Sequence, residues 1–250
     1  MKRNISLLCA ACALLILPSC KFIRVSDELL SQMQGNPQGI SIDVDVDTHG
    51  DSVNPSDNVI TQDEVTGEFH NLQVNIPGDV VYTPGDCFFN ITGPDNVIEH
   101  MTVRNENGTL VVKSDGTRFR NLKNLKITIS SPVLEDVVFN GAVDFSAPEG
   151  ITALDFNATV NGAGDIDING LKAGKVRVTV NGAGDATIYR IECDDLVLAI
   201  NGAGDATVSG HAGTADLSIS GAGDIDALDL KAENITSKVR GIGKIKKAKI

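Results

Sequence analysis

Residues 161–209 have the sequence NGAGDIDING LKAGKVRVTV NGAGDATIYR IECDDLVLAI NGAGDATVS, in which the motif Asn-Gly-Ala-Gly-Asp occurs three times. Related copies of the motif lie on both sides of this stretch. Their first glycines are Gly141, Gly162, Gly182, Gly202, Gly221 and Gly241, separated by 21, 20, 20, 19 and 20 residues. A period this regular indicates one structural unit that stacks on neighbouring copies of itself.

The residues around each glycine pair alternate between apolar and polar. Val176, Val178 and Val180 precede one pair, and Ala186 and Ile188 follow it. A period of two predicts strands, and no helical period interrupts it. Two or three short strands in each turn of about 20 residues predict an all-β fold, a single-domain parallel β-helix (β-solenoid) whose coils rise roughly 4.8 Å each.

The N-terminus has the pattern of an export signal. Lys2 and Arg3 precede an apolar run that is too short to act as a stop-transfer helix, and the run leads into Leu17-Pro18-Ser19-Cys20. This ending resembles the lipobox of bacterial lipoproteins. The resemblance implies a signal peptide over residues 1–19, cleavage before Cys20, and acylation of that cysteine, which would attach the chain to a membrane.

The rest of the chain divides into three parts. Residues 20–60 comprise the lipidated cysteine and a flexible tether, in which Ile40, Ile42, Val44 and Val46 alternate with polar residues as a short strand would. Residues 61–250 form the β-helical domain, with irregular first coils over 61–135 and regular repeats over 136–250. In the irregular part, Asn107-Gly108 marks the bend of a hairpin whose second strand contains Leu110.

A family resemblance rests on three features: the Asn-Gly-Ala-Gly-Asp coils, the strand Leu110-Val111-Val112, and the lead-in Leu125-x-Ile127-x-Ile129-x-x-Pro132-x-Leu134. Together they resemble the head GIN domain family over roughly residues 65–250. This family is described as a "putative auto-transporter adhesin head" and is common in Bacteroidetes lipoproteins. The resemblance implies a β-helical fold and a cell-envelope location, and it brings no established catalytic residue or ligand.

The aspartates that end the motifs are the main candidate site. If the alternation continues through the glycines, these side chains point outward and form a ladder with like charges about one strand spacing apart. The ladder consists of Asp165, Asp185, Asp205 and Asp224. The repulsion between these carboxylates destabilises the fold unless other interactions offset it.

Three arrangements could relieve this repulsion. Each carboxylate could accept hydrogen bonds from N–H groups of its own turn, as Asx turns do. The ladder could bind calcium or act as a contact for a partner, although nonapeptide calcium repeats recur every nine residues and these recur every 20. The carboxylates could also perform acid–base catalysis, but they recur in one context, which does not separate their pKa values. We therefore expect no catalytic residues, no metal site and no cofactor, with calcium as the exception kept open.

Charge and the remaining reactive residues limit the partners. The formal net charge of −12 disfavours nucleic acid. Cys87 and Cys193 could form a disulfide, but buried free thiols are the simpler interpretation, and His211 is expected on an exposed turn. In the last coil, Lys244 and its neighbouring lysines would oppose end-to-end stacking of solenoids.

The sequence therefore predicts a non-catalytic lipoprotein of the cell envelope, anchored by lipid to the outer membrane, whose solenoid binds a glycan or a protein. Two alternatives stay open: a β-helical polysaccharide lyase or hydrolase, and a calcium-dependent assembly protein. Display on the cell surface and orientation toward the periplasm are both compatible with the sequence. Acidic residues that often follow the lipidated cysteine in surface lipoproteins begin here only at Asp27, after Lys21 and Arg24.

Overall fold

The structure is a computed structural model that describes residues 52–64 and 66–248. These residues belong to one unit, Thr48–Ile250. The signal sequence, Cys20 and the alternating segment at residues 40–46 lie outside the described residues.

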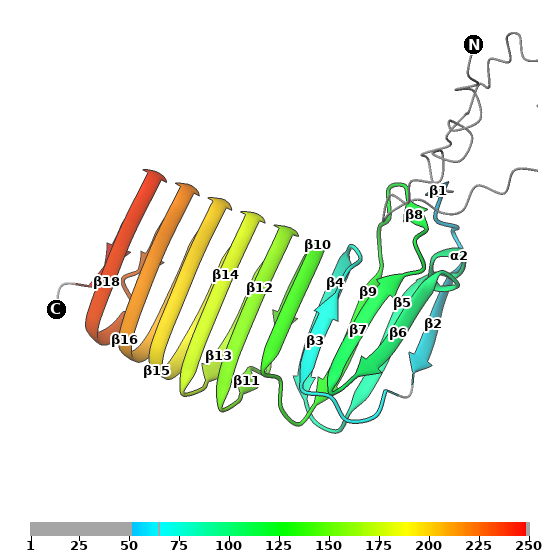
Figure 1. The fold of residues 1–250 in the computed structure, drawn as a ribbon, viewed down its shortest axis with the longest axis horizontal. Coiled ribbons are helices and arrows are strands. Elements are labelled where there is room, and N and C mark those ends of the chain that lie inside the picture. Colours follow the sequence, from blue (N-terminus) through cyan, green and yellow to red (C-terminus); the bar gives the residue numbers. More distant parts are fainter. Residues whose placement is uncertain (1–51, 65, 249–250) are drawn as a thin grey trace, which may run out of the picture. The chain divides into compact units, whose positions relative to one another are not determined.

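Parallel strands form the regular array and lie side by side along the molecule (Figure 1). Each coil pairs with the next in a register that brings equivalent repeat positions together, so that Gly162 pairs with Gly182 and Gly182 with Gly202. This pairing confirms the predicted parallel β-solenoid. The strands of the array are β10 (Asp136–Ala147), β11 (Ile151–Thr152), β12 (Asp155–Ala163), β13 (Ile166–Lys172), β14 (Lys175–Ala183), β15 (Ala186–Ala203), β16 (Ala206–Ala222), β17 (Ile225–Ala227), β18 (Leu230–Ile242) and β19 (Ile245–Lys247).

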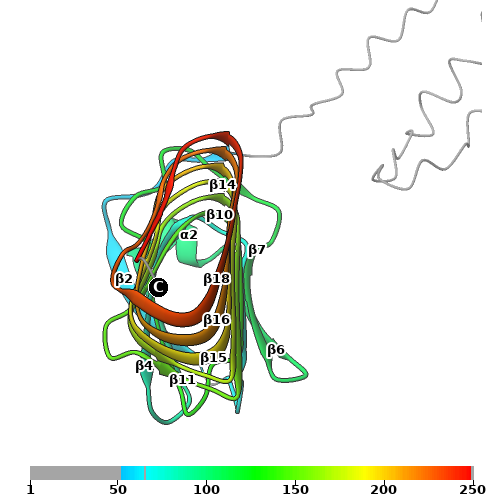
Figure 2. The same cartoon turned by 90° about the vertical axis from the view of Figure 1, so that its left-hand side faces the viewer.

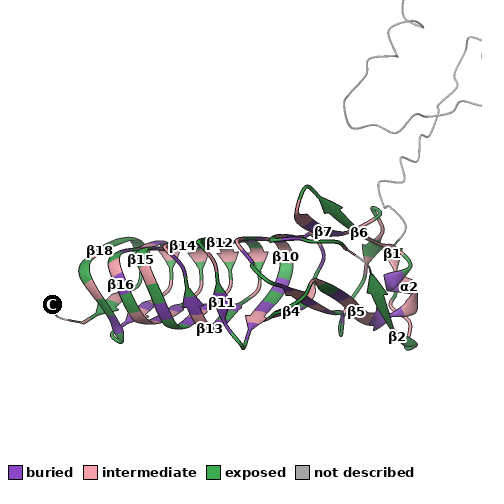
Figure 3. Ribbon diagram, turned by 90° about the horizontal axis from the view of Figure 1, so that it is seen from below, coloured by how far each residue is buried: buried purple, intermediate pink, exposed green. Residues whose placement is uncertain are grey.

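Seen along the stack, the coils superimpose as a flattened loop (Figure 2). Alternate residues point into this loop, and the predicted inward set is confirmed: Val176, Val178 and Val180 are all buried. Figure 3 shows the same alternation of buried and exposed residues along the strands. Because each inward side chain lies on the equivalent one of the next coil, a thin column of aliphatic side chains is shielded from water along the array.

The glycines of the motif allow the coils to approach closely at the corner. At Gly182, a Cβ atom would lie 1.9 Å from the carbonyl oxygen of Gly162. The close backbone approach, more than the turn itself, therefore requires glycine at this position.

The N-terminal layers are not stacked in chain order. The segment β3–β4 lies between β10 on one side and β7 and β9 on the other, all in parallel. The strands are β3 (Asn71–Val74), β4 (Gly78–Pro84), β5 (Phe88–Pro94), β6 (Met101–Glu106), β7 (Thr109–Ser114) and β9 (Lys126–Ser131). The predicted hairpin is confirmed as the antiparallel pair β6–β7, with Asn107 at φ 55° and Gly108 at φ 81°.

Antiparallel strands and a short helix close this end. β2 (Val59–Glu64) pairs with β5, which pairs with β9. Helix α2 (Asp95–Ile98) buries Val97 and Ile98 in the core at the end of the stack (Figures 1 and 2). These elements cover backbone and apolar side chains that the first coil would otherwise expose.

The folded unit begins before residue 61, the boundary that the sequence suggests. β1 (Ser52–Val53) pairs with β8 (Arg118–Phe119), and β2 begins at Val59. The last part of the predicted tether is therefore ordered, because it supplies strands to the closed end.

Candidate functional site

The motif aspartates form a ladder along one corner of the solenoid. The backbone N–H of Asp185 donates to Oδ1 of Asp165 at 2.8 Å, and the N–H of Asp205 donates to Oδ1 of Asp185 at 2.7 Å. Asp224 makes the same contact with Asp205, at 2.7 Å. The carbonyl of Asp185 in turn accepts the N–H of Ile166 at 2.8 Å. Each carboxylate thus joins its own coil to the next.

This geometry corrects one expectation. The carboxylates do accept backbone N–H groups, but from the following coil and not from their own turn. The physical reason is the direction in which the turn points the backbone N–H of each aspartate. This N–H faces the preceding coil, where Oδ1 of the equivalent aspartate accepts it. Hydrogen bonds to a charged acceptor are stronger than neutral ones, which offsets part of the like-charge repulsion.

The ladder is longer than the four aspartates that the motifs define. Asp144 accepts the N–H of Asp165 at 3.0 Å, and Asp79 lies beside Asp144 in the strand register. At the other end, the N–H of Lys244 donates to Asp224 at 2.7 Å. The strand pairing between distant segments, which the sequence does not reveal, is what adds Asp79.

The ladder offers little to acid–base chemistry. Asp165, Asp185 and Asp205 are exposed and make the same contact, so no environment distinguishes a proton donor from a base. Among residues 52–64 and 66–248, no three His, Cys, Asp or Glu side chains converge as a metal site would require. The arrangement is suited to joining coils.

A second ladder runs beside the first. The side-chain amide of Asn181 donates to Oδ1 of Asn161, and that of Asn201 donates to Oδ1 of Asn181, at 2.9 and 3.0 Å. Asn140 extends it by donating to Asn75 at 2.6 Å. Stacked amides of this kind stabilise parallel in-register strands, which explains the asparagine of the motif.

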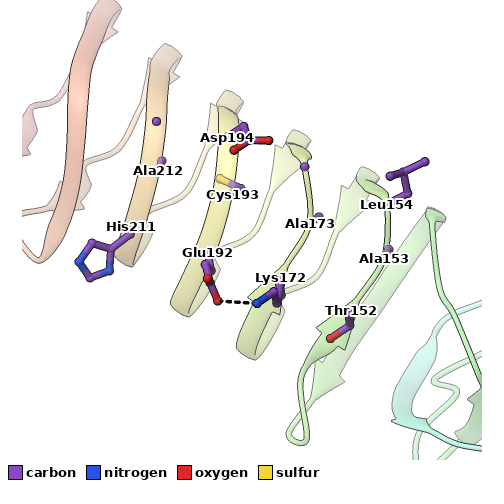
Figure 4. Close-up of a pocket in the computed structure, with 12 residues that line it drawn as sticks. Thr152, Ala153, Leu154, Lys172, Ala173, Glu192, Cys193, Asp194, His211 and Ala212 are labelled. Carbon is purple, nitrogen blue, oxygen red and sulfur yellow. Dashed lines mark ion pairs between the residues drawn. The ribbon is translucent and has the colours of Figure 1, made fainter.

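A concave region with a volume of about 480 Å³ lies on another side of the array (Figure 4). One column of outward side chains runs along it from Thr152 through Lys172 and Glu192 to His211, because these residues are consecutive partners in the register. Nζ of Lys172 lies 3.2 Å from Oε2 of Glu192. We call this region the column groove. Its twelve lining residues are Thr152, Ala153, Leu154, Lys172, Ala173, Gly174, Glu192, Cys193, Asp194, His211, Ala212 and Gly213.

The column groove brings a thiol and an imidazole into one region, but not into a catalytic pair. Burial first, and then the charges of Asp194 and Asp195, raise the pKa of Cys193 to about 11. The thiol is therefore protonated at neutral pH and is a poor nucleophile. The groove thus offers a mixed surface of charge, imidazole and apolar atoms.

The sequence placed His211 on an exposed turn, and the structure exposes it, although on strand β16. Its proximity to Glu192 and Lys172 was not anticipated. The sequence does contain a signal for this proximity, because positions 172, 192 and 211 are separated by the repeat period. Cys87 and Cys193 are both free and half-buried.

His100 belongs to a separate cluster near the closed end. Its Nδ1 lies 3.0 Å from Oδ2 of Asp115 and 3.2 Å from Oγ1 of Thr117. Hydrogen bonds from Thr117 and then from His100 hold the pKa of Asp115 well below its usual range. The cluster fixes a loop, and it involves no residue of the ladder or the column groove.

A family model for "Putative auto-transporter adhesin, head GIN domain" matches residues 68–189 and 159–248, which together span most of the chain. The chain belongs to the head GIN domain family. The residues that carry the match are those of the array and of the layers that precede it.

Solved structures share the fold of this GIN domain. A protein from Bacteroides fragilis titled "putative adhesin" is 24% identical, with a TM-score of 0.65, and the match covers 78% of this chain and 99% of that one. A "putative adhesin" from Parabacteroides distasonis is 20% identical, with a TM-score of 0.74 and coverage of 79% and 84%. A "putative lipid binding protein" from the same species is 18% identical, with a TM-score of 0.67 and coverage of 78% and 100%.

Comparison with curated proteins finds no match. In the part of the chain that the structure describes, no helix is long and apolar enough to cross a membrane.

Proposed function

We propose that this GIN-domain chain is a non-catalytic lipoprotein of the cell envelope whose solenoid is a rigid binding surface for adhesion. Cys20 would carry the lipid and attach the chain to the outer membrane, and the partner would be a glycan or a protein. The family description supports an adhesin-like role. The aspartate ladder is the observation that supports a non-catalytic role. Its carboxylates accept backbone hydrogen bonds that join neighbouring coils.

The column groove is the best candidate for contact with a partner. It is concave, and it combines the Lys172–Glu192 ion pair and His211 with the side chain of Leu154, which is 80% exposed. Polar groups fix the orientation of a ligand, and an exposed apolar side chain contributes buried area on binding. A surface built on rigid, mutually paired strands also loses little conformational entropy when it binds.

The test is a glycan and protein array probed with residues 21–250. We expect reproducible binding without depolymerisation of acidic polysaccharides. Glu192→Lys with His211→Glu should weaken the binding at least tenfold, whereas Lys175→Glu with Arg177→Glu, neither of which lines the groove, should leave it unchanged. Cleavage of a polysaccharide that Asp185→Asn or Asp205→Asn abolishes would instead establish an enzyme.

Lipidation is tested separately by metabolic labelling with palmitate. We expect the label on the full chain and its loss in Cys20→Ser. Protease treatment of intact cells then distinguishes display on the cell surface, where the solenoid is cut, from orientation toward the periplasm, where it is protected. Label that persists in Cys20→Ser would refute the proposed anchor.

A further inference from the structure

The two ends of the solenoid differ. The first coil is closed by β2, β5 and α2, whereas β18 pairs with β16 on one side and with no described strand on the other. The inward positions of β18 are correspondingly uncovered. Val239 is 40% exposed, whereas its partner in the preceding coil, Ile219, is 1% exposed. We call β18 with the outward side chains that follow it, to Lys247, the open edge.

The open edge is positively charged on an acidic protein. Lys238, Arg240 and Lys244 take the places that Ser218, Ser220 and Asp224 hold one coil earlier. None of these three cations forms an ion pair with a residue between 52 and 248 that the structure describes. The formal net charge of the chain is −12. Two such edges repel each other, whereas an acidic strand would complement the edge.

The chain contains a sequence with this pattern. Residues 40–47 are Ile-Ser-Ile-Asp-Val-Asp-Val-Asp, with apolar residues at every second position and aspartates between them. In a parallel register, Asp45 would lie beside Lys238 and Asp47 beside Arg240. The same register sets Ile42, Val44 and Val46 over Ile235, Ser237 and Val239, which are the inward positions of β18. From Ile42 to Asp47, charge and apolar pattern therefore match together, whereas Ile40 falls beside the exposed Glu233.

The segment cannot reach the open edge of its own molecule. The described residues begin at Ser52 in β1, which pairs with β8 at the closed end. Seven coil steps separate Leu110 there from Ser237 in β18, about 34 Å at ~4.8 Å for each step. The five steps from Asp47 to Ser52 span at most about 17 Å. The strand must come from another molecule.

We propose that the open edge binds residues 40–47 of a second copy of this chain as an added parallel strand. The added strand pairs with the backbone groups of β18 and replaces the contact of Lys247 Nζ with the carbonyl of Ile235. It covers Ile235 and Val239 and sets its carboxylates beside Lys238 and Arg240. Each molecule has one donor segment and one acceptor edge on different surfaces, so the contact is heterologous and joins molecules head to tail. The inference is independent of the proposed binding function.

Charge reversal on each side gives the test. The protein is residues 21–250, which retain the donor segment and every described strand of the solenoid. Variant one is Lys238→Glu with Arg240→Glu, and variant two is Asp45→Lys with Asp47→Lys. The control, Lys175→Glu with Arg177→Glu, changes the net charge as variant one does but lies in mid-array.

Sedimentation velocity at low salt reports assembly. We expect the wild type and the control to form species that grow with concentration and dissociate in high salt, because the contacts are charged. Each variant alone should stay monomeric, and an equimolar mixture should assemble, since the reversed edge of variant one matches the reversed strand of variant two. A wild type that is monomeric at every concentration, or a mixture that does not assemble, overturns the proposal.

A second measurement covers the case in which variant one is misfolded. A synthetic peptide of residues 39–48 is titrated into variant two, whose edge is native. We expect saturable binding, and at least tenfold weaker binding by a peptide with Asp45→Lys and Asp47→Lys. Equal binding of the two peptides, or no binding, overturns the proposal.

Discussion

At the scale of single residues, two side-chain requirements create the repeat. Glycine is needed where neighbouring coils touch, and aspartate is needed where a backbone N–H faces the preceding coil. At Gly182 both sterics and conformation exclude other residues: φ is +145°, and a Cβ atom would approach the carbonyl oxygen of Gly162. The glycines and aspartates of the motif therefore mark the positions where neighbouring coils contact each other.

Gly182→Ala should lower the free energy of unfolding by about 2–4 kcal/mol, because the methyl group forces two coils apart and the conformation is strained. Gly116→Ala is the control. Its φ of +110° is also in the left-handed region, but nothing lies within 4 Å of the added atom, and we expect a loss of about 1 kcal/mol. Urea denaturation measures both, and equal losses would contradict the steric argument.

The thiol of Cys193 provides a pH-dependent prediction. Its pKa is raised to about 11 by burial and by nearby carboxylates, so the thiolate is scarce at neutral pH and increases as the pH rises. In the Cys87→Ser variant, where Cys193 is the remaining thiol among the described residues, we expect the rate of alkylation in the native protein to be low at neutral pH and to climb toward pH 11. The denatured variant should react at the rate of an ordinary thiol. Rapid native alkylation at neutral pH would show that the thiol is activated.

At the scale of strands, the sequence predicts the array well because every coil repeats the same local signals. The period gives the register, and the alternation identifies the inward side, as Val176, Val178 and Val180 illustrate. The N-terminal layers are different. Alternation in β3 and β4 predicts strands, but their insertion between β10 and β7 depends on contacts between distant segments, for which no period exists.

The same limit applies to the candidate site. The outward ladder follows from the sequence, whereas the partner of each carboxylate does not, because a backbone N–H direction is set by the turn geometry. The column from Lys172 to His211 could be derived from the repeat period. Its groove shape depends on the small neighbours Ala173 and Gly213, which carry no distinctive pattern.

The stability of each strand should depend on its place in the stack. Leu198 is 0% exposed with coils on both sides, so Leu198→Ala should lower the free energy of unfolding by about 2–4 kcal/mol. Val239 is 40% exposed on the open edge, so Val239→Ala should cost less than about 1 kcal/mol. Denaturant titration of the two variants, at concentrations where wild type is monomeric, makes the comparison. Similar losses of unfolding free energy in the two variants would contradict this expectation and would mean that the side chain of Val239 is covered.

At the scale of the whole molecule, the described unit is a stack closed at one end and open at the other, with like charges along one corner. Its regular polar residues serve the stacking, and the column groove and the open edge are the surfaces left for partners. This division of roles rests on one claim: the ladder aspartates act as joints between coils.

The melting temperature of the variant with Asp165, Asp185, Asp205 and Asp224 all changed to Asn tests this claim most directly. Asparagine keeps the acceptor oxygen and removes a repulsion of about 1 kcal/mol for each adjacent pair in water. At low salt, at a concentration where the wild type is monomeric, without and with calcium, we predict a melting temperature equal to or above that of the wild type, and no calcium effect on either protein. A lower melting temperature in the variant, or a rise with calcium in the wild type alone, would contradict the account.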